Sequence, residues 1–495
     1  MRLPLERALL RRRGGPPPVL ERRVGVAPLR DGVRRGPLHG LPARPPRRLA
    51  PAAVEARAGG GVVAVESVLL VTIDALRADH CGFLGYDRDT TPFLDSLATG
   101  ALVFESAFAV GPGTPSSFAS LFSSRYPLEF GGYEGFSGSR PSLPEHLHRR
   151  GMRTTGIHSN PYLSRHYGYD RGFDHFADSF EEREEPGLFD RVKTEAAALL
   201  SRDETAYRLG RRLFLAAFDE EKPYVDAVET TDRVLEWLAD APDRSFCWAH
   251  YLDVHGPYLP PDEHLDRDLP PDRVEALNDR VQADDPSLSE RDLAALEALY
   301  DGELRYVDAE LERLFDGLEA RGRLGDTAVV VTADHGEEFL DHGRLGHHPR
   351  LYDELIHVPL LVWLPPGARE SFDAAAAGRV PGQVSLLDVA PTVTDLLGAE
   401  SAPRFGGRSA LRESGHPVVS EVSNPHGVLK LDQRFRRRSV RTGDWKLVVG
   451  PDGEELYDLE SDPDELEDLR GERPGRAAEL RETLARERDI DPGAV

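Results

Sequence analysis

The sequence predicts a doubly wound α/β fold, in which a mostly parallel central sheet is flanked by helices. Two observations lead to this prediction: short apolar segments rich in β-branched residues, and segments of helical periodicity that lie between them. The length of 495 residues allows a large core and excludes a small cross-linked scaffold. Only Cys81 and Cys247 are cysteines, too few for a disulfide framework, and we expect both to be buried thiols.

The strand candidates alternate with helical patterns along the chain. Val68–Ile73 is a continuous apolar run that suits a strand buried on both faces of a parallel sheet. Apolar residues recur at spacings of three and four from Leu304 to Leu318, which indicates an amphipathic helix. The other strand candidates are residues 246–252, 328–332 and 358–363.

The C-terminal part of the chain has a different pattern. Strand-like segments at residues 445–449 and 455–459 flank turn residues around Asp452, which predicts a β-hairpin. A charged helix is expected after Pro474. The predicted organisation is a tail at residues 1–62, an α/β domain at 63–400 and a small α+β subdomain at 401–495.

The charge distribution separates the N-terminal tail from the rest of the chain. Residues 1–60 contain 14 Arg, four acidic residues and ten Pro, a composition that buries too little apolar surface to order itself. We therefore expect residues 1–62 to be a basic, disordered tail. A functional basic arm and a wrongly assigned start codon are the alternative interpretations.

The remaining chain is strongly acidic. The net charge is −25, and the +10 of residues 1–60 leaves −35 on residues 61–495, while only four of the 61 basic residues are Lys. This composition is typical of a salt-adapted, halophilic protein and argues against a nucleic-acid partner. Because the sequence contains neither an apolar run of membrane-spanning length nor a secretory signal, we expect a cytoplasmic protein without a membrane span.

Polar residues follow two of the predicted strands directly. Asp74 follows the first strand, and Asp334 and His335 follow the strand at residues 328–332. Ligands of doubly wound sheets gather beyond the carboxyl ends of the strands, so we expect these residues to meet in space. Asp and His are suitable ligands for a divalent metal ion, although an Asp in this position can also simply cap a helix.

Other polar residues lie in loops. Thr114 lies in a Gly/Pro-rich loop and could instead be the N-cap of a helix over residues 116–123. Asp253 and His255 are two residues apart, and His347 precedes His348. Each histidine, taken alone, could also be an ordinary hydrogen-bonded loop or core residue.

Together and in this order, these motifs resemble the sulfatase family of the alkaline phosphatase superfamily, from about Ser67 to Asp468. The resemblance implies an alkaline-phosphatase-like fold and a metal-dependent hydrolase of sulfuric or phosphoric esters, with a small-molecule or glycan ester as substrate. The motifs that carry it are residues 72–80, 90–95, 250–258, 332–337, 351–354 with 358–360, and 444–447 with 456–459.

The resemblance also implies roles for single residues. Thr114 occupies the position of the nucleophile and is expected to be a metal ligand, and His255 and His347 are expected to contact the transferred group or protonate the leaving oxygen. We also expect His348 and Arg77 to contact the substrate. The implied cofactor is one divalent ion (Ca²⁺, Mg²⁺, Mn²⁺ or Zn²⁺), held by Asp74, Thr114, Asp334 and His335.

The chain departs from the family at the nucleophile. Family members convert a Cys or Ser in a Cys/Ser-x-Pro-x-Arg pattern to formylglycine, whereas this chain has Thr114 there and Phe118 in place of the Arg. No Lys lies between Lys222 and Lys430, where the family often supplies one to the sulfate; His347 or His348 could substitute. Thr is the nucleophile of related phosphodiesterases and phosphotransferases, which favours a phosphate ester.

Two alternatives stay open at this point. Asp253, His255 and His347 could form a second metal site, as in a two-metal phosphodiesterase or phosphotransferase. The loss of the Cys and Arg is also compatible with an inactive protein that binds a sulfated or phosphorylated glycan. The natural substrate and the oligomeric state are not indicated by the sequence.

Overall fold

The computed structural model describes residues 65–178, 224–365, 368, 378–424 and 429–491. All of them belong to one compact unit. The tail predicted at residues 1–62 lies outside the described residues, and its disorder stays a prediction. The boundary predicted at residue 400 likewise stays a prediction, because the residues on both sides of it belong to the same unit.

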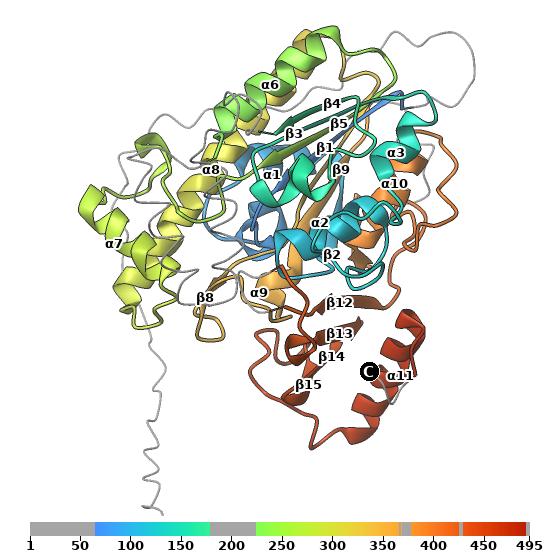
Figure 1. The fold of residues 1–495 in the computed structure, drawn as a ribbon. Coiled ribbons are helices and arrows are strands. Elements are labelled where there is room, and N and C mark those ends of the chain that lie inside the picture. Colours follow the sequence, from blue (N-terminus) through green and yellow to red (C-terminus); the bar gives the residue numbers. More distant parts are fainter. Residues whose placement is uncertain (1–64, 179–223, 366–367, 369–377, 425–428, 492–495) are drawn as a thin grey trace, which may run out of the picture. The chain divides into compact units, whose positions relative to one another are not determined.

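A large sheet contains the four strands predicted from the sequence. Its strands are β1 (Ser67–Ile73), β2 (Ala101–Phe108), β3 (Arg153–His158), β4 (His175–Asp178), β5 (Ser245–Tyr251), β6 (Thr327–Ala333), β9 (His357–Trp363), β10 (Arg379–Val380) and β11 (Val384–Ser385). Their order is β10-β2-β9-β6-β1-β5-β3-β4, and β11 also pairs with β2. β1 is parallel to β5 and β6, whereas β9 is antiparallel to β2 and β6. This mixed, mostly parallel sheet confirms the predicted fold class (Figure 1).

Helices cover both faces of the sheet (Figure 1). The α-helices are α1 (Pro92–Ala98), α2 (Thr114–Ser123), α3 (Leu143–His148), α6 (Ala227–Asp240), α7 (Pro271–Gln282), α8 (Glu290–Ala320), α9 (Asp353–Ile356), α10 (Val389–Leu396) and α11 (Pro474–Arg488). Successive side chains of a strand point to opposite faces of the sheet, so strand β5 contacts helices on both sides. Trp248 packs against Phe118 of α2, while the Tyr251 hydroxyl lies 3.0 Å from that of Thr231 in α6.

Short elements complete the chain. The helix predicted around Leu304 is the long helix α8, and α6 packs along it. A two-stranded ribbon joins β7 (Glu338–Phe339) and β8 (Leu345–Gly346). Short 3-10 segments cover residues 78–80, 82–84, 161–163, 165–167, 262–264, 386–388 and 433–435.

The C-terminal region forms a second, antiparallel sheet. Its strands are β12 (Val418–Val422), β13 (Arg437–Thr442), β14 (Trp445–Gly450) and β15 (Gly453–Asp458), paired in that order, and α11 packs on β13 and β14. The predicted hairpin is β14–β15, and the predicted helix is α11. Strand β12 contacts the main domain, because the Glu421 N–H donates to the Val110 carbonyl oxygen at 2.7 Å.

A largely buried ionic cluster also links the second sheet to helix α9. The fully buried Lys446 of β14 donates to Asp353 Oδ1 of α9 at 2.7 Å and to Glu465 Oε2 at 2.9 Å, and Arg441 of β13 pairs with the other Asp353 oxygen. Burial favours the neutral acid, but the charges of Lys446 and Arg441 hold the pKa of Asp353 well below its usual range. We call Asp353, Arg441, Lys446 and Glu465 the ionic latch.

Two further expectations can be checked in the described residues. Cys81 and Cys247 are both buried free thiols, as predicted. Among the described segments, no helix combines the length and the apolar character that crossing a bilayer requires.

Candidate active site

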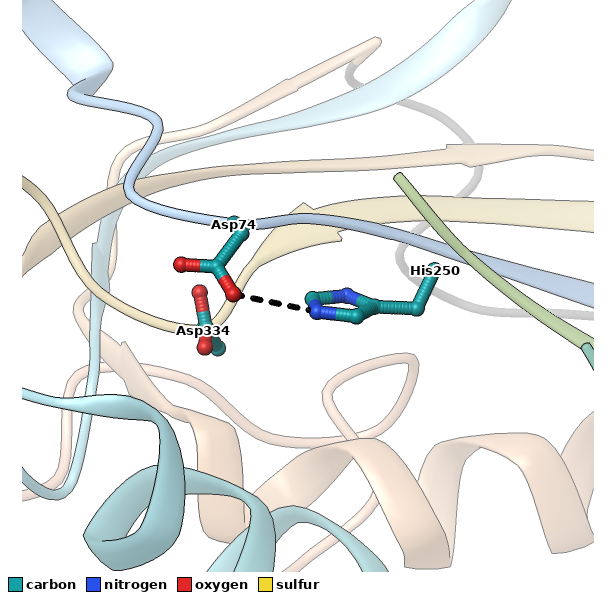
Figure 2. Close-up of side chains that lie close together, drawn as sticks. All are labelled: Asp74, His250 and Asp334. Carbon is teal, nitrogen blue, oxygen red and sulfur yellow. Dashed lines mark hydrogen bonds and ion pairs between the residues drawn. The ribbon is translucent and has the colours of Figure 1, made fainter. Parts of the chain in front are cut away.

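The site lies where β1 and β6 end. These strands pair in parallel with Ile73 opposite Ala333, so the next residues, Asp74 and Asp334, fall at the same edge of the sheet. Both carboxylates are fully buried, and Figure 2 shows them close together. The expectation that these strand-end residues meet in space, across 260 positions of sequence, is therefore met.

His335 and Thr114 complete the cluster. His335 Nδ1 lies 2.8 Å from the Gly336 carbonyl oxygen, which can only accept, so Nδ1 carries the proton. Its Nε2 then faces Asp74 Oδ1 at 3.5 Å and Asp334 Oδ2 at 3.6 Å. Thr114 Oγ1 lies 3.4 Å from His335 Nε2 and 3.4 Å from Asp74 Oδ2.

The same two carboxylate oxygens lack hydrogen-bond donors. Asp74 Oδ1 and Asp334 Oδ2 are buried without a hydrogen-bond partner among the described residues. Buried polar atoms are normally paired, so these two oxygens beside His335 Nε2 favour a positive charge, which either a protonated His335 or a bound cation supplies. This donor set of two carboxylates, an imidazole and a hydroxyl fits a divalent cation.

The protonation properties of the cluster show that its carboxylates attract positive charge, so a metal ion and a proton on His335 Nε2 would compete for the same place. Burial raises the pKa of Asp334, and the charge of Asp74 raises it further. Burial would also raise the pKa of Asp74, but the hydrogen bond from His250 and the nearby histidines hold it below its usual range. The pKa of His335 is raised, because the two carboxylates outweigh the effect of burial.

Two residues that the sequence did not single out bind Asp74. Asn160 Nδ2 donates to Asp74 Oδ2 at 2.9 Å, and His250 Nε2 lies 3.2 Å from the same oxygen. Asn160 follows β3 as Asp74 follows β1, so its position at a strand end was a usable signal. His250 is a polar residue inside the buried strand β5, and it lies in one of the motifs that carry the family resemblance.

Thr114 is the first residue of α2 and is buried. The helix N-cap is Gly113, so the alternative in which Thr114 caps a helix over residues 116–123 is wrong. Ser117, one turn further on, donates to the Asp334 carbonyl oxygen at 2.5 Å and ties α2 to the loop after β6. The free N–H groups of the first turn of α2 also favour an anion beside Thr114.

His347 and His255 lie next to this cluster. The ring centroid of His347 is 4.5 Å from that of His335 and 5.1 Å from that of His255. Glu337 Oε1 lies 3.0 Å from His347 Nδ1, and Glu337 Oε2 accepts from the Tyr258 hydroxyl at 3.0 Å. Burial lowers the pKa of His347 to about 4, despite Glu337, so the imidazole is neutral at pH 7.

Arg77 and His348 are held in other contacts. The Arg77 guanidinium binds the carboxylates of Asp79 and Asp341 and the Glu337 carbonyl oxygen. His348 Nε2 lies 3.1 Å from the Leu345 carbonyl oxygen and 3.3 Å from Asp284 Oδ1. The structure therefore does not bring these two residues together with the cluster around Asp74, and the geometry lends no support to their predicted substrate contacts.

The second metal site receives no support either. Across the described ranges, the acidic, histidine and cysteine side chains placed to share one cation are Asp74, His250 and Asp334, with ligand atoms within 4.8 Å of one another. Asp253, His255 and His347 do not form such a group there.

Comparisons with known proteins agree with this geometry. The profile of the Sulfatase family matches residues 66–399. Arylsulfatase K of Bos taurus is 24% identical over 509 residues, which covers 92% of this chain and 84% of that protein. The phosphonate monoester hydrolase of Agrobacterium radiobacter has a similar structure, with a TM-score of 0.62 and 21% identity over 86% of this chain and 95% of the other. A structure in complex with its substrate D-glucosamine-2-N,6-O-disulfate matches with a TM-score of 0.63 and 18% identity, over 86% and 98%.

The family match extends over more than half of the chain and includes the elements that carry Asp74, Thr114, Asp334 and His335. The two structural matches show the same fold. The chain belongs to the sulfatase family of the alkaline phosphatase superfamily and is a hydrolase of sulfate or phosphate esters.

Proposed function

We propose that this protein cleaves its ester through a Thr114 nucleophile held beside one divalent metal ion. One observation carries the proposal: Thr114 Oγ1 and two buried carboxylate oxygens without hydrogen-bond donors, Asp74 Oδ1 and Asp334 Oδ2, all lie 3.4 to 3.6 Å from His335 Nε2. Asp74, Asp334 and His335 would hold the ion, together with Thr114. When bound, such an ion neutralises the carboxylates, favours ionisation of a hydroxyl and polarises an ester oxygen.

In the reaction, the Thr114 oxygen attacks the sulfur or phosphorus of the ester. A bond from Oγ1 to that atom forms as the bond to the alcohol oxygen breaks, and water later releases the sulfate or phosphate from Thr114. His347 is suited to accept the Thr114 proton, because Glu337 fixes its Nδ1–H and leaves Nε2 with a lone pair. His347 or the adjacent His255 then protonates the leaving oxygen.

The substrate we propose is an anionic ester of a small molecule or glycan, and Thr114 favours a phosphate ester. The structural matches are compatible with an ester of either phosphorus or sulfur, since one is a phosphonate monoester hydrolase and the other is in complex with its substrate, a disulfated glucosamine. We also retain the proposals of a salt-adapted and cytoplasmic protein, on composition alone.

Substrate class and metal are tested together. Purified protein is assayed against an aryl sulfate, an aryl phosphate and an aryl phosphodiester, each with Mg²⁺, Ca²⁺, Mn²⁺ or Zn²⁺. We expect turnover only with a divalent ion, and the fastest turnover with a phosphate ester. Turnover of the sulfate alone would contradict the phosphate preference but not the family.

The nucleophile is tested by substitution. Thr114→Ala is expected to lower turnover by about three orders of magnitude or more while substrate still binds, because the attacking atom is removed and Asp74, Asp334 and His335 remain to hold the ion. Thr114→Ser should keep part of the activity, with a less restricted hydroxyl. Ser116→Ala, which removes a hydroxyl bonded to the Gly113 carbonyl oxygen, is the matched control.

Direct detection adds a second measurement. Quenched reactions digested for mass spectrometry should contain a sulfo or phospho group on Thr114. If Thr114→Ala turned over like the wild type, the nucleophile would have to be another hydroxyl or water.

A further inference from the structure

His250 is close enough to Asp74 and Asp334 to be counted among the residues able to share a cation. Its side chain extends from β5 towards Asp74, and its Nε2 lies 3.2 Å from Asp74 Oδ2 (Figure 2). Two roles are compatible with this distance: Nε2 could bind the metal through its lone pair, or it could carry a proton and donate it to Asp74. The position of the imidazole proton decides between them.

The neighbours of His250 determine that position. The Trp248 Nε1–H can only donate, and it lies 2.9 Å from Thr72 Oγ1, which therefore accepts. The Thr72 hydroxyl either donates to His250 Nδ1 at 2.9 Å, or accepts from Nδ1–H and donates to the Ala249 carbonyl oxygen at 3.4 Å. The second arrangement relies on the long 3.4 Å bond and sets the Nε2 lone pair against an Asp74 carboxylate oxygen that can only accept, so we infer that Thr72 donates to His250 Nδ1.

A neutral imidazole that accepts at Nδ1 carries its proton at Nε2. His250 Nε2–H therefore donates to Asp74 Oδ2, alongside the amide of Asn160 at 2.9 Å. A nitrogen that carries a proton has no lone pair for a metal. The chain Trp248, Thr72, His250 and Asp74 is fully buried, so water does not compete for these bonds.

In this arrangement the two oxygens of the Asp74 carboxylate have different partners. Oδ2 is occupied by the donors His250 and Asn160, whereas Oδ1 has no donor and lies 3.5 Å from His335 Nε2. The ring plane of His250 is fixed as well, since Phe118 packs edge-on against it with centroids 4.9 Å apart. Phe118 stands where the family pattern has Arg, so here that position supports the imidazole.

We propose that His250 is a positioning residue that holds Asp74 Oδ1 towards the metal, and that it is not a metal ligand. Trp248 and Thr72 set its tautomer. This inference rests on the proposed cation site, with His335 as the one nitrogen ligand from the residues argued above. It predicts that a substitution of His250 changes the affinity for the metal only through its effect on Asp74.

The test uses the full-length protein loaded with Mn²⁺. Electron spin echo envelope modulation detects nitrogen bound directly to Mn²⁺, and chelator competition gives the dissociation constant. We expect the nitrogen signal to persist in His250→Gln, whose amide can still donate to Asp74, and to disappear in His335→Gln. His250→Leu, which lacks the donor, should weaken Mn²⁺ binding about 10–100-fold while keeping the nitrogen signal at saturation.

The tautomer of His250 is tested by substituting Thr72, which contacts His250 and not Asp74. Thr72→Val removes the donor to His250 Nδ1 without changing side-chain shape, and should weaken Mn²⁺ binding several-fold, with Thr72→Ser restoring it. Thr332→Val is the matched control: Thr332 pairs with Thr72 in the sheet and is equally buried, but it donates to the Pro359 carbonyl oxygen. Thermal midpoints establish that each variant is folded.

The outcomes separate this inference from the proposed function. Loss of the nitrogen signal in His250→Gln, or wild-type affinity in both His250→Leu and Thr72→Val, would overturn the positioning role and leave the cation site intact. A wild-type protein that binds no Mn²⁺ would overturn the cation site itself, and this inference with it.

Discussion

At the scale of single residues, each Asp or His atom that faces the proposed cation site belongs to a side chain whose other polar atom is held by a neighbour. Gly336 fixes the proton of His335, and Asn160 occupies the second oxygen of Asp74. The backbone N–H groups of Ala75 and His335 bind Asp334 Oδ1, at 3.2 and 3.0 Å, and leave Oδ2 open. The site is thus preorganised for a positive charge before substrate binds.

Removal of a metal ligand should abolish both metal and activity. Asp334→Ala and His335→Ala are expected to lose stoichiometric metal, measured by mass spectrometry after dialysis, and to lose turnover, with their circular dichroism spectra unchanged. Chelation of the wild type should have the same effect and should be reversed by adding the ion back.

Asp178 provides the matched control for these variants. It is another buried carboxylate at the end of a strand, β4, and it accepts from the Arg165 N–H. Asp178→Ala should therefore keep its metal. Retention of metal and near-normal turnover in both Asp334→Ala and His335→Ala would place the ion elsewhere.

The sequence predicted the site only partly, for a physical reason. Asp74, Asp334 and His335 could be placed because the ends of parallel strands meet at one edge whatever the side chains do. His250 was missed because its role depends on where its ring points and on the proton of Thr72. Asp253, which has a similar sequence signal, does not form a cation group with His255 and His347 in the described residues.

At the scale of elements, the ribbon of β7 and β8 carries the chain from His335 to His347. His342, in the turn of this ribbon, lies with Nδ1 2.8 Å from Glu354 Oε1 and Nε2 3.3 Å from the Glu465 carbonyl oxygen. Its ring also stacks on Tyr352 at 3.6 Å. Burial lowers the pKa of His342, but Glu354 outweighs burial and raises it above the ordinary value.

This raised pKa predicts the pH dependence of stability. The group binds its proton more tightly in the folded state, so its contribution is fully present below the unfolded pKa of about 6.5 and is lost as pH rises through the folded pKa. The difference in free energy of unfolding between wild type and His342→Gln should be larger at pH 6 than at pH 8.5, as measured by urea titration.

His264 provides a control of opposite sign. Burial lowers its pKa, so its contribution is present above pH 6.5 and is lost as pH falls. The difference between wild type and His264→Gln should therefore grow from pH 6 to pH 8.5. If both differences changed in the same direction, the assigned role of His342 would be wrong.

The long, fully buried elements were predictable and the short ones were not. All residues of β1, β5 and β6 are buried, so their patterns are continuous apolar runs. Strands β10 and β11 have two residues each, too few to show a strand pattern in the sequence. They form by pairing with the backbone of β2. Strand β13 is largely Arg and Ser and also lacks an apolar run, whereas β12 is fully buried but only five residues long.

At the scale of the whole molecule, the dominant feature is the charge of −35 on residues 61–495. Closely spaced carboxylates repel one another unless cations screen them. We predict that the thermal midpoint rises as KCl increases from tens of millimolar to the molar range, and that NaCl of equal ionic strength has the same effect. A flat or falling midpoint would contradict salt adaptation.

The ionic latch affects the point during synthesis at which the protein becomes active. Asp353 leaves the ribosome long before Lys446, so its carboxylate lacks its cationic partners until the last strands have been made. Until Arg441 and Lys446 are made, the segment that contains Asp353, a few residues beyond His347, lacks the contacts that hold it in its final position. We therefore expect a nascent chain to acquire hydrolytic activity only once its last strands have been made, which delays ester cleavage until translation is nearly finished.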